Sequence, residues 1–459
     1  MSNLDRNTSS QWQSSIGFIA AAAGSAVGLG NIWKFPYITG ENGGGTFVLF
    51  YLLCIAILGL PILIAEIAIG RTTQSSPVRA FRRLGGSSSL WQLVGALGVS
   101  AGILILSYYS VVAGWGLHYL WLTIANKLPL ENNPQAYVDL FDSLVASSRL
   151  NIWWHSVFMG MTIMVVLRGI RSGIEKFANW GMLGLLLLLG GLAIYGATLP
   201  GFIPAIEFIF GFSDRFTWKS ALEALGHAFF SLSLGIGAML TYGSYLKRNE
   251  NLVKAAVAIA IADTVVALGA CSVIFPIVFS VGLEPSAGPG LIFINIPLAL
   301  LQLPFGRWIM LLFFSLLMLA ALTSAVSLLE MAVAFLIDSC GWSRTVATVT
   351  IGIFIYLLGI PSALSGGTGF FGAELTSSIG MNWFDTADYL TTNWLLPLGG
   401  IGISLFVGWQ WNRRLQQQEF STGSKLGSLN WLYLTWRWAL RWLCPLAIVL
   451  IMLYNLKVL

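Results

Sequence analysis

The sequence predicts an all-α polytopic membrane protein, because apolar residues dominate it and recur in long runs. Of its 459 residues, 56% are hydrophobic and only 9% are charged, whereas a soluble domain carries roughly 25% charged residues. Runs of roughly 20 apolar residues, enough to cross a bilayer as a helix, follow one another along the chain. We predict eleven spans, beginning near residues 14, 46, 91, 152, 179, 222, 252, 305, 345, 388 and 430.

One further apolar stretch is not counted as a span. The segment 291-LIFINIPLALLQLPF-305 is short and contains Pro297 and Pro304. We predict a re-entrant or external hairpin near 285–304.

The distribution of basic residues predicts the orientation, since Lys and Arg favour short cytoplasmic loops. They follow the even-numbered spans: Arg71, Arg79, Arg82, Arg83, Arg168, Arg171, Lys176, Lys247, Arg248, Lys254, Arg344, Arg413, Arg414 and Lys425. The N-terminus is therefore expected in the cytoplasm and, with an odd span count, the C-terminus outside a plasma (inner) membrane. This topology accounts for the net charge of +5, which does not indicate a nucleic-acid partner.

Enzymatic chemistry finds little support. The four cysteines, Cys54, Cys271, Cys340 and Cys444, lack the spacing of metal ligands. No zinc, nucleophile-elbow or phosphate-loop motif is present. We therefore predict neither an enzyme nor an organic cofactor.

Two of the predicted spans contain poor helix formers at mid-membrane depth. They are 24-GSAVGLGNIWKFPY-37 and 226-GHAFFSLSLGIGAMLTY-242, each with a Gly-x-Gly. Glycine lowers helix stability by about 1 kcal/mol relative to alanine, and irregular backbone is tolerated in a bilayer only where it lines a cavity. Interrupted helices at matching positions of inverted halves indicate a substrate and ion site; the alternative is close helix packing through small residues.

Each interrupted span opens a block of five, and an odd number makes the two blocks run in opposite senses. The predicted organisation is a cytoplasmic tail (1–13), a first repeat of spans one to five (14–200), a second repeat of spans six to ten (201–411), a cytoplasmic loop (412–429) and an eleventh span (430–459).

At these residues the chain resembles the neurotransmitter:sodium symporter family, in particular its bacterial, leucine-transporter-like amino-acid branch. The motifs that carry the resemblance are GSAVGLGNIWKFP, 41-ENGGGTF-47, 66-EIAIGR-71, 107-SYYS-110, SLSLGIGAMLTY and 321-ALTSAVSLLE-330. The resemblance implies a 5+5 inverted repeat with spans one and six unwound, plus an eleventh span.

The resemblance also implies two Na⁺ sites and a substrate site. The first ion would be held by Ala26, Asn31, Ser231 and Asp263, together with the substrate carboxylate. The second would be held by Gly24, Val27, Ala320, Thr323 and Ser324. The substrate would contact Ala26, Leu29, Gly30, Ile105, Tyr109, Phe230, Ser231, Ser233, Ile236, Ser324 and Leu328. Na⁺ is a hard cation and prefers such oxygen ligands.

Gly28 bears on the class of substrate, and Asp263 bears on whether transport depends on chloride. Amine-carrying relatives have an aspartate at the Gly28 position, so glycine favours a substrate that brings its own carboxylate. Asp263 stands where chloride-dependent relatives have asparagine, which favours chloride independence; a helix-end polar residue is the alternative. His227 replaces the family's usual glutamine and is either proton-sensitive or a neutral core histidine. Glu66 and Glu330 are assigned structural or proton-linked roles.

The expected outer gate comprises Lys34, Asp388, Tyr109 and Phe230, and the inner gate comprises Trp12, Tyr245 and Asp338. The family's inner-gate arginine is Ser9 here, with Arg6 one turn away as a substitute. In span five the family's Gly-x9-Pro is reduced to Gly173, because Leu183 replaces the proline. A continuous helix is expected there, since leucine is a strong helix former.

The function that these residues favour is Na⁺-coupled import of a hydrophobic L-amino acid by alternating access, without chloride. Two alternatives stand beside it: a non-transporting amino-acid sensor, and a uniporter or proton-coupled exchanger on the same fold.

Overall fold

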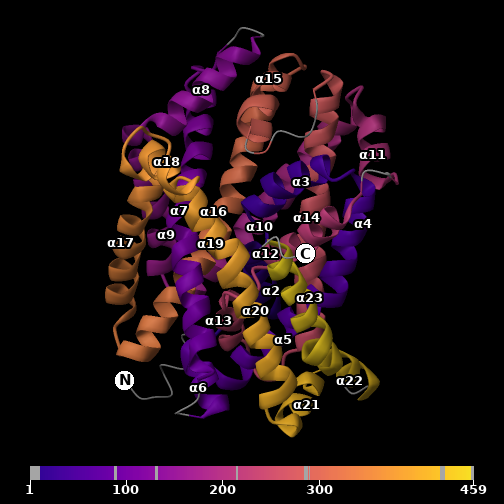
Figure 1. Cartoon of the computed structure of the whole chain (residues 1–459), viewed down its shortest axis with the longest axis vertical. Coiled ribbons are helices and arrows are strands. Elements are labelled where there is room, and N and C mark those ends of the chain that lie inside the picture. Colours follow the sequence, from indigo (N-terminus) through magenta and orange to yellow (C-terminus); the bar gives the residue numbers. More distant parts are fainter. Residues whose placement is uncertain are drawn as a thin grey trace.

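A computed structural model describes residues 11–86, 90–129, 133–212, 216–283, 288, 290–423 and 430–455 of the protein (Figure 1). These residues form an all-helical bundle. Nine of their helices are long and apolar enough to cross a membrane, or ten if the bent pair Ser15–Ala26 and Gly30–Glu41 is one span. The eleven-span count stays a prediction, because the sixth segment consists of helices of 14 and 7 residues.

The helices of the first half are α2 (Ser15–Ala26), η1 (Gly30–Lys34), α3 (Phe35–Glu41), α4 (Gly45–Cys54), η2 (Ile55–Gly59), α5 (Leu60–Thr73), α6 (Pro77–Gly85), α7 (Gln92–Ile124), α8 (Pro134–Ala146), α9 (Ser148–Leu167), η3 (Ile170–Glu175), α10 (Lys176–Ala197) and α11 (Phe202–Phe210). The η elements are short π-helical segments that continue their neighbours.

The second half comprises α12 (Trp218–Ser231), α13 (Ala238–Ser244), α14 (Leu252–Ser280), η4 (Leu291–Asn295), α15 (Ile296–Leu301), α16 (Gly306–Cys340), α17 (Arg344–Ala363), η5 (Phe370–Glu374), α18 (Leu375–Ile379), α19 (Trp383–Leu390), η6 (Thr391–Leu395), α20 (Leu396–Leu405), η7 (Phe406–Gln410), α21 (Arg413–Ser421), α22 (Asn430–Trp438), η8 (Ala439–Leu443) and α23 (Cys444–Asn455).

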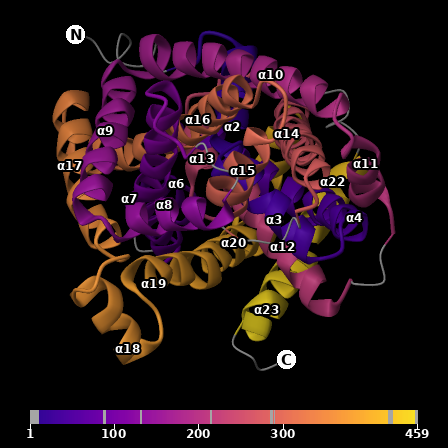
Figure 2. The same ribbon diagram turned by 90° about the horizontal axis from the view of Figure 1, so that it is seen from above.

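The two broken segments occupy the middle of the bundle. Seen from above, α2 and α13 lie inside a ring that includes α9, α10, α14, α17 and α20 (Figure 2). The long helices α7 and α16 pack along each other beside them. Near 285–304, where a hairpin is expected, the described residues form one short apolar helix, η4 continued by α15, and the hairpin stays a prediction.

Helices α5 and α13 touch through their backbones. A Cβ atom on Gly70 would lie 1.9 Å from the carbonyl oxygen of Leu240, and one on Gly243 would lie 2.7 Å from that of Ile67. Glycine is therefore required on both helices at this crossing. The contact joins the second span directly to the second half of the sixth.

One end of the bundle is rich in arginine. Helices α6, α21 and α22 lie at one end, and α8, α11, α15 and α18 lie at the other (Figure 1). Arg79, Arg82, Arg83, Arg413 and Arg414 belong to α6 and α21. We call this end of the bundle the basic end.

Candidate functional site

The first span is broken where the sequence places glycine on both sides of a leucine. Helix α2 stops at Ala26, Val27 is extended (φ −72°, ψ 106°), and the chain turns by 52° before η1 begins at Gly30. The backbone carbonyls around the break are thereby released from the helical hydrogen-bond ladder. They become available to other partners in the centre of the protein.

The sixth segment is broken at a similar place in the bundle. Between the end of α12 at Ser231 and the start of α13 at Ala238, the residues Ser233, Gly235 and Gly237 have φ values of 53°, 83° and 82°. Residues with a side chain rarely adopt such positive φ values, which explains why two of these three positions are glycine. The amide of Gly235 donates to Oε1 of the buried Glu66 carboxylate at 2.7 Å, so α5 supplies an acceptor to the opened backbone.

A cavity of about 40 Å³ lies between the two breaks. All eleven residues predicted to contact substrate line it: Ala26, Leu29, Gly30, Ile105, Tyr109, Phe230, Ser231, Ser233, Ile236, Ser324 and Leu328. Ser25, Gly28 and Leu396 complete the lining. Leu396 was missed by sequence reasoning, because it begins α20 and belongs to no recognised motif.

Gly28 lies against two hydroxyl groups of this cavity. A Cβ atom at Gly28 would be 2.6 Å from Ser324 Oγ and 3.2 Å from the Tyr109 hydroxyl. The neighbouring amide of Leu29 donates to the same tyrosine hydroxyl at 3.3 Å. The site therefore has no room for a side chain at position 28 unless its neighbours move.

One buried polar cluster joins α12, α14 and the broken first span. Ser231 Oγ donates to the Asp263 carboxylate at 2.8–2.9 Å, and Asn31 Nδ2 donates to Asp263 Oδ1 at 2.7 Å. The Tyr51 hydroxyl donates to Asp263 Oδ2 at 3.2 Å. The ion pairs among the described residues do not include Asp263, so its charge is stabilised there by neutral donors alone.

Three of the four groups predicted for the first ion meet in this cluster, and Ala26 lines the adjoining cavity. The side-chain oxygen Oδ1 of Asn31 accepts from the Gly28 amide at 3.0 Å. The side chain of Asn31 thus ties the break in the first span to Asp263.

A second oxygen cluster lies between α2 and α16. Ser324 Oγ is 3.3 Å from the Gly24 carbonyl oxygen and 3.0 Å from that of Val27. Thr323 Oγ1 is 3.0 Å from the Ala320 carbonyl oxygen and 3.5 Å from that of Val27. All five groups predicted for the second ion are therefore neighbours.

The chemistry of this second cluster fits a hard monovalent cation. The Ser324 hydroxyl also lies 3.2 Å from the Ser25 carbonyl oxygen, and one hydroxyl proton can serve only part of such a group of acceptors. Oxygen lone pairs in excess of protons are what Na⁺ requires. Among the residues that the structure describes, no cluster of three or more His, Cys, Asp or Glu side chains suits a transition metal.

His227 is buried above the first cluster. Its ring stacks on Phe35 at 5.5 Å between centroids and lies 5.6 Å from the Tyr51 ring. Neither ring nitrogen has a hydrogen-bond partner among the described residues. The structure surrounds this histidine with aromatic rings rather than with hydrogen-bonding groups.

Two charged members of the expected outer gate, Lys34 and Asp388, are not paired with each other among the ion pairs of the described residues. Lys34 Nζ lies over the Phe230 ring, 4.7 Å from its centroid. Asp388 Oδ1 instead accepts from the hydroxyls of Tyr108 at 3.1 Å and Thr392 at 3.3 Å. The aromatic face of Phe230 therefore stabilises the lysine, and hydroxyl donors stabilise the aspartate.

Phe230 and Leu396 line both the central cavity and a second cavity of about 240 Å³, and Lys34 lines only the second. Tyr109, the other aromatic member of the expected gate, lines only the central cavity. Phe230 is thus the member of the predicted gate that lines both cavities.

At the basic end, the predicted gate residues are in contact with the chain around α13. Trp12 Nε1 donates to the Tyr242 carbonyl oxygen at 2.9 Å, and the Trp12 amide donates to that of Tyr245 at 3.1 Å. The Tyr245 hydroxyl donates to buried Glu330 at 2.7 Å. Glu330 also forms an ion pair with Arg344, a partner that sequence reasoning treated only as a marker of orientation.

Asp338 is held by α6. Its carboxylate accepts from the Ser76 amide at 2.7 Å and lies 3.7 Å from Arg79 Nη1. Arg6 and Ser9, the two positions considered for an arginine partner, lie outside the described residues. In span five, α10 runs without interruption through Leu183, as expected from the missing proline.

Comparison with known proteins agrees with this geometry. The chain matches the Sodium:neurotransmitter symporter family over residues 9–146 and 138–459. It is 39% identical over 445 residues to the sodium-dependent transporter YhdH of Bacillus subtilis (strain 168), covering 96% of this chain and 97% of the relative. It is 24% identical over 541 residues to the sodium- and chloride-dependent neutral and basic amino acid transporter B(0+) of Homo sapiens, covering 99% and 80%.

The fold is similar to that of a solved structure, MhsT in complex with L-phenylalanine. The TM-score is 0.86 at 42% identity, over 97% of this chain and 99% of that one. Family match and fold similarity both extend over nearly the whole chain. An integral membrane protein of this kind is a transporter and not an enzyme, and the chain belongs to the sodium:neurotransmitter symporter family.

Proposed function

We propose that this sodium-dependent transporter is a symporter that imports a hydrophobic L-amino acid by alternating access. The observation that carries the proposal is the central cavity, which lies between two broken segments and beside two buried oxygen clusters. Broken half-helices offer amide groups to a carboxylate and carbonyl groups to Na⁺.

Gly28 supports an α-amino acid as the substrate. Its neighbours Ser324 and Tyr109 leave no space for a side chain, so the protein supplies no carboxylate at that point and the substrate brings its own. We assign the substrate carboxylate to the amides of Leu29 and Gly30 and to the Tyr109 hydroxyl. The substrate ammonium is assigned to the carbonyls of Ala26, Phe230 and Ser231 and to the Ser233 hydroxyl.

The remaining walls of the cavity support a hydrophobic side chain. Ile105, Phe230, Ile236 and Leu328 are apolar. The similar protein MhsT was crystallised with L-phenylalanine, which fits the same class of substrate.

Two Na⁺ ions per cycle are proposed, one at each oxygen cluster. If the substrate carboxylate is itself a ligand of the first ion, each binds more tightly when the other is present. Each positive charge that enters along the membrane potential contributes about 2.3 kcal/mol per 100 mV.

We further propose that transport does not require chloride. Asp263 places a carboxylate beside the first ion position without a basic partner in the described structure. The protein can therefore provide the negative charge that a bound chloride would otherwise supply.

The proposed topology has eleven spans in two inverted repeats of five, an internal N-terminus and an external C-terminus. The basic end of the bundle would face the cytoplasm, as the positive-inside rule requires.

Reconstituted vesicles test the proposal. Purified protein in proteoliposomes should accumulate radiolabelled hydrophobic L-amino acids under an imposed inward Na⁺ gradient, equally in chloride and in gluconate. Binding without accumulation would indicate a sensor. Accumulation that follows a proton gradient, or exchange independent of Na⁺, would indicate the other mechanisms.

A further inference from the structure

The eleventh predicted span carries a pair of arginines and a pair of tryptophans that transport does not use. They form the sequence 437-RWALRW-442, where α22 continues into η8. Arg437 and Arg441 are four residues apart, as are Trp438 and Trp442, so each pair shares a helix face. The segment lies next to α21 at the basic end of the bundle (Figure 1).

Contacts with the end of α20 and η7 hold Arg441 in place. Gly408 allows the close approach, since a Cβ atom there would lie 2.8 Å from Arg441 Cα. Trp409 Nε1 donates to the Arg441 carbonyl oxygen at 3.2 Å. The Arg441 guanidinium lies over the Trp409 ring, 3.6 Å from its centroid. The cation is therefore oriented by a π face rather than by an ion pair with a described residue.

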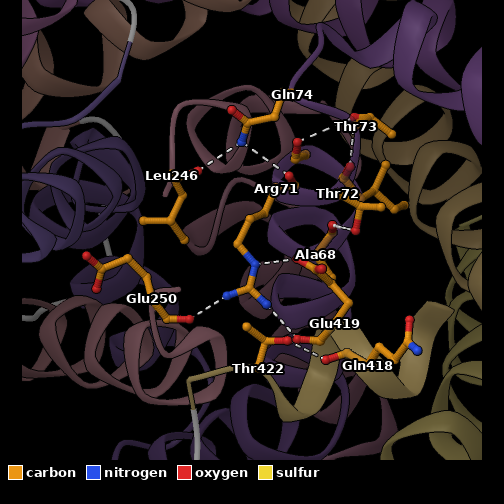
Figure 3. Close-up of polar contacts among 12 residues, drawn as sticks. Ala68, Arg71, Thr72, Thr73, Gln74, Leu246, Glu250, Gln418, Glu419 and Thr422 are labelled. Carbon is orange, nitrogen blue, oxygen red and sulfur yellow. Dashed lines mark hydrogen bonds and ion pairs between the residues drawn. The ribbon is translucent and has the colours of Figure 1, made fainter. Parts of the chain in front are cut away.

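Neither arginine has an anionic partner among the residues that the structure describes. Nε of Arg437 and Nε of Arg441 are buried without a hydrogen-bond acceptor, and neither side chain forms an ion pair, within the described part of the chain. Arg71 shows the contrast. It is buried at the same end, pairs with Glu419 and donates to the backbone carbonyls of Glu250 and Glu419 (Figure 3).

A shallow groove runs along one face of α22 and η8, beside the two arginines. Its volume is about 540 Å³, and its lining consists of Leu434, Thr435, Arg437, Trp438, Arg441 and Trp442. Trp438 is 57% exposed and Trp442 is 52% exposed, at the periphery of a bundle that is apolar enough to span a membrane. Tryptophan is enriched at the level of lipid headgroups, and two arginine forks suit the oxygens of a phosphate.

We propose that this groove binds the phosphodiester of an anionic membrane phospholipid. Arg437 and Arg441 donate to the phosphate oxygens, while Trp438 and Trp442 lie along the glycerol and the first part of an acyl chain. A net negative lipid is favoured over a zwitterionic one, because the choline cation of the latter would oppose the two arginines. Lys and Arg residues near the membrane surface attract anionic lipids, at about 1 kcal/mol for each residue.

Native mass spectrometry of the purified full-length protein tests the proposal. Lipid is titrated as phosphatidylglycerol or as phosphatidylcholine, and the variant R437Q/R441Q is compared with R248Q/R414Q. The control removes the same charge from exposed positions at the same end but outside the groove. Equal thermal midpoints and monodisperse elution show that both variants are folded.

The wild type should bind one phosphatidylglycerol more tightly than phosphatidylcholine. R437Q/R441Q should lose about thirtyfold in affinity, from the contribution of two basic residues near a lipid surface, while the control changes by less than about twofold. The variant R437K/R441K keeps the charge but loses the planar guanidinium donors, so its affinity for phosphatidylglycerol should lie between those of R437Q/R441Q and the control. An unchanged phosphatidylglycerol affinity in R437Q/R441Q, or an equal loss of affinity in the control variant, would overturn the proposal.

A second arm separates lipid from free phosphate. Inorganic phosphate should neither displace phosphatidylglycerol nor raise the thermal midpoint at millimolar concentration. If it does both as well as the lipid, the groove is an anion site and the lipid assignment is wrong.

Discussion

Ser324 Oγ lies 3.0 Å from the carbonyl oxygen of Val27, and this contact joins α16 to the break in the first span. The same hydroxyl is surrounded by the carbonyls of Gly24 and Ser25. A cation at this point would bind both helices at once. The occupancy of the second oxygen cluster would thus report directly on whether α2 and α16 are held together.

Replacing Ser324 with alanine should weaken sodium activation. The change removes one of two hydroxyl ligands, so we expect the Na⁺ concentration for half-maximal uptake to rise about tenfold, a loss on the scale of one hydrogen bond to a charge. Ser404→Ala is the matched control, since among the described residues that buried hydroxyl bonds only to the Gly400 carbonyl within its own helix. Equal sodium curves for both variants would contradict the assignment.

Replacing Asp263 with asparagine should make transport sensitive to chloride. The wild-type carboxylate is buried among Asn31, Ser231 and Tyr51, and asparagine removes its charge with little change in shape. Uptake by wild type should be equal in chloride and gluconate. Uptake by Asp263→Asn should fall in both media and fall further in gluconate. Strict chloride dependence of the wild type would refute the proposal.

A single methyl group at position 28 should impair substrate binding. The Cβ atom of Gly28→Ala would lie 2.6 Å from Ser324 Oγ, so the hydroxyls that face the cavity must shift. We expect at least about a tenfold loss in amino-acid affinity, measured by scintillation proximity, on the scale of overpacking a tight site. Gly160→Ala on α9 has open space at its Cβ position and should bind substrate normally.

Removing one partner of the ion pair between Glu330 and Arg344 should destabilise the protein more than removing both partners. Glu330 is fully buried, and a buried charge left without its partner costs roughly 3–5 kcal/mol. Arg344→Gln should therefore lower the thermal midpoint strongly, and the double variant Glu330→Gln/Arg344→Gln should recover part of the loss. Additive midpoint shifts would show that the two side chains do not depend on each other.

The sequence carries more information about the central cavity than about the gates. Positions such as Gly235 and Gly237 indicate a broken helix, because left-handed backbone angles favour glycine. The motifs around them indicate which residues line the central cavity. Leu396 gave no such signal, since any apolar residue could begin α20. Its place in the lining depends on tertiary packing alone.

The gates depend on which conformation the protein adopts, and composition carries no information about that. Lys34 and Asp388 have the charges of a pair, yet Phe230 and the hydroxyls of Tyr108 and Thr392 engage them separately. Arg344 pairs with Glu330 from the far side of a turn between α16 and α17. Local sequence could not indicate that geometry.

The glycine crossing of α5 and α13 restricts how the sixth segment can move. Gly70 lies against the Leu240 carbonyl and Gly243 against that of Ile67, so sliding of α13 along α5 would have to break both close contacts. We therefore expect any swing of α13 to carry the second span with it. The moving part would then be a pair of helices rather than one.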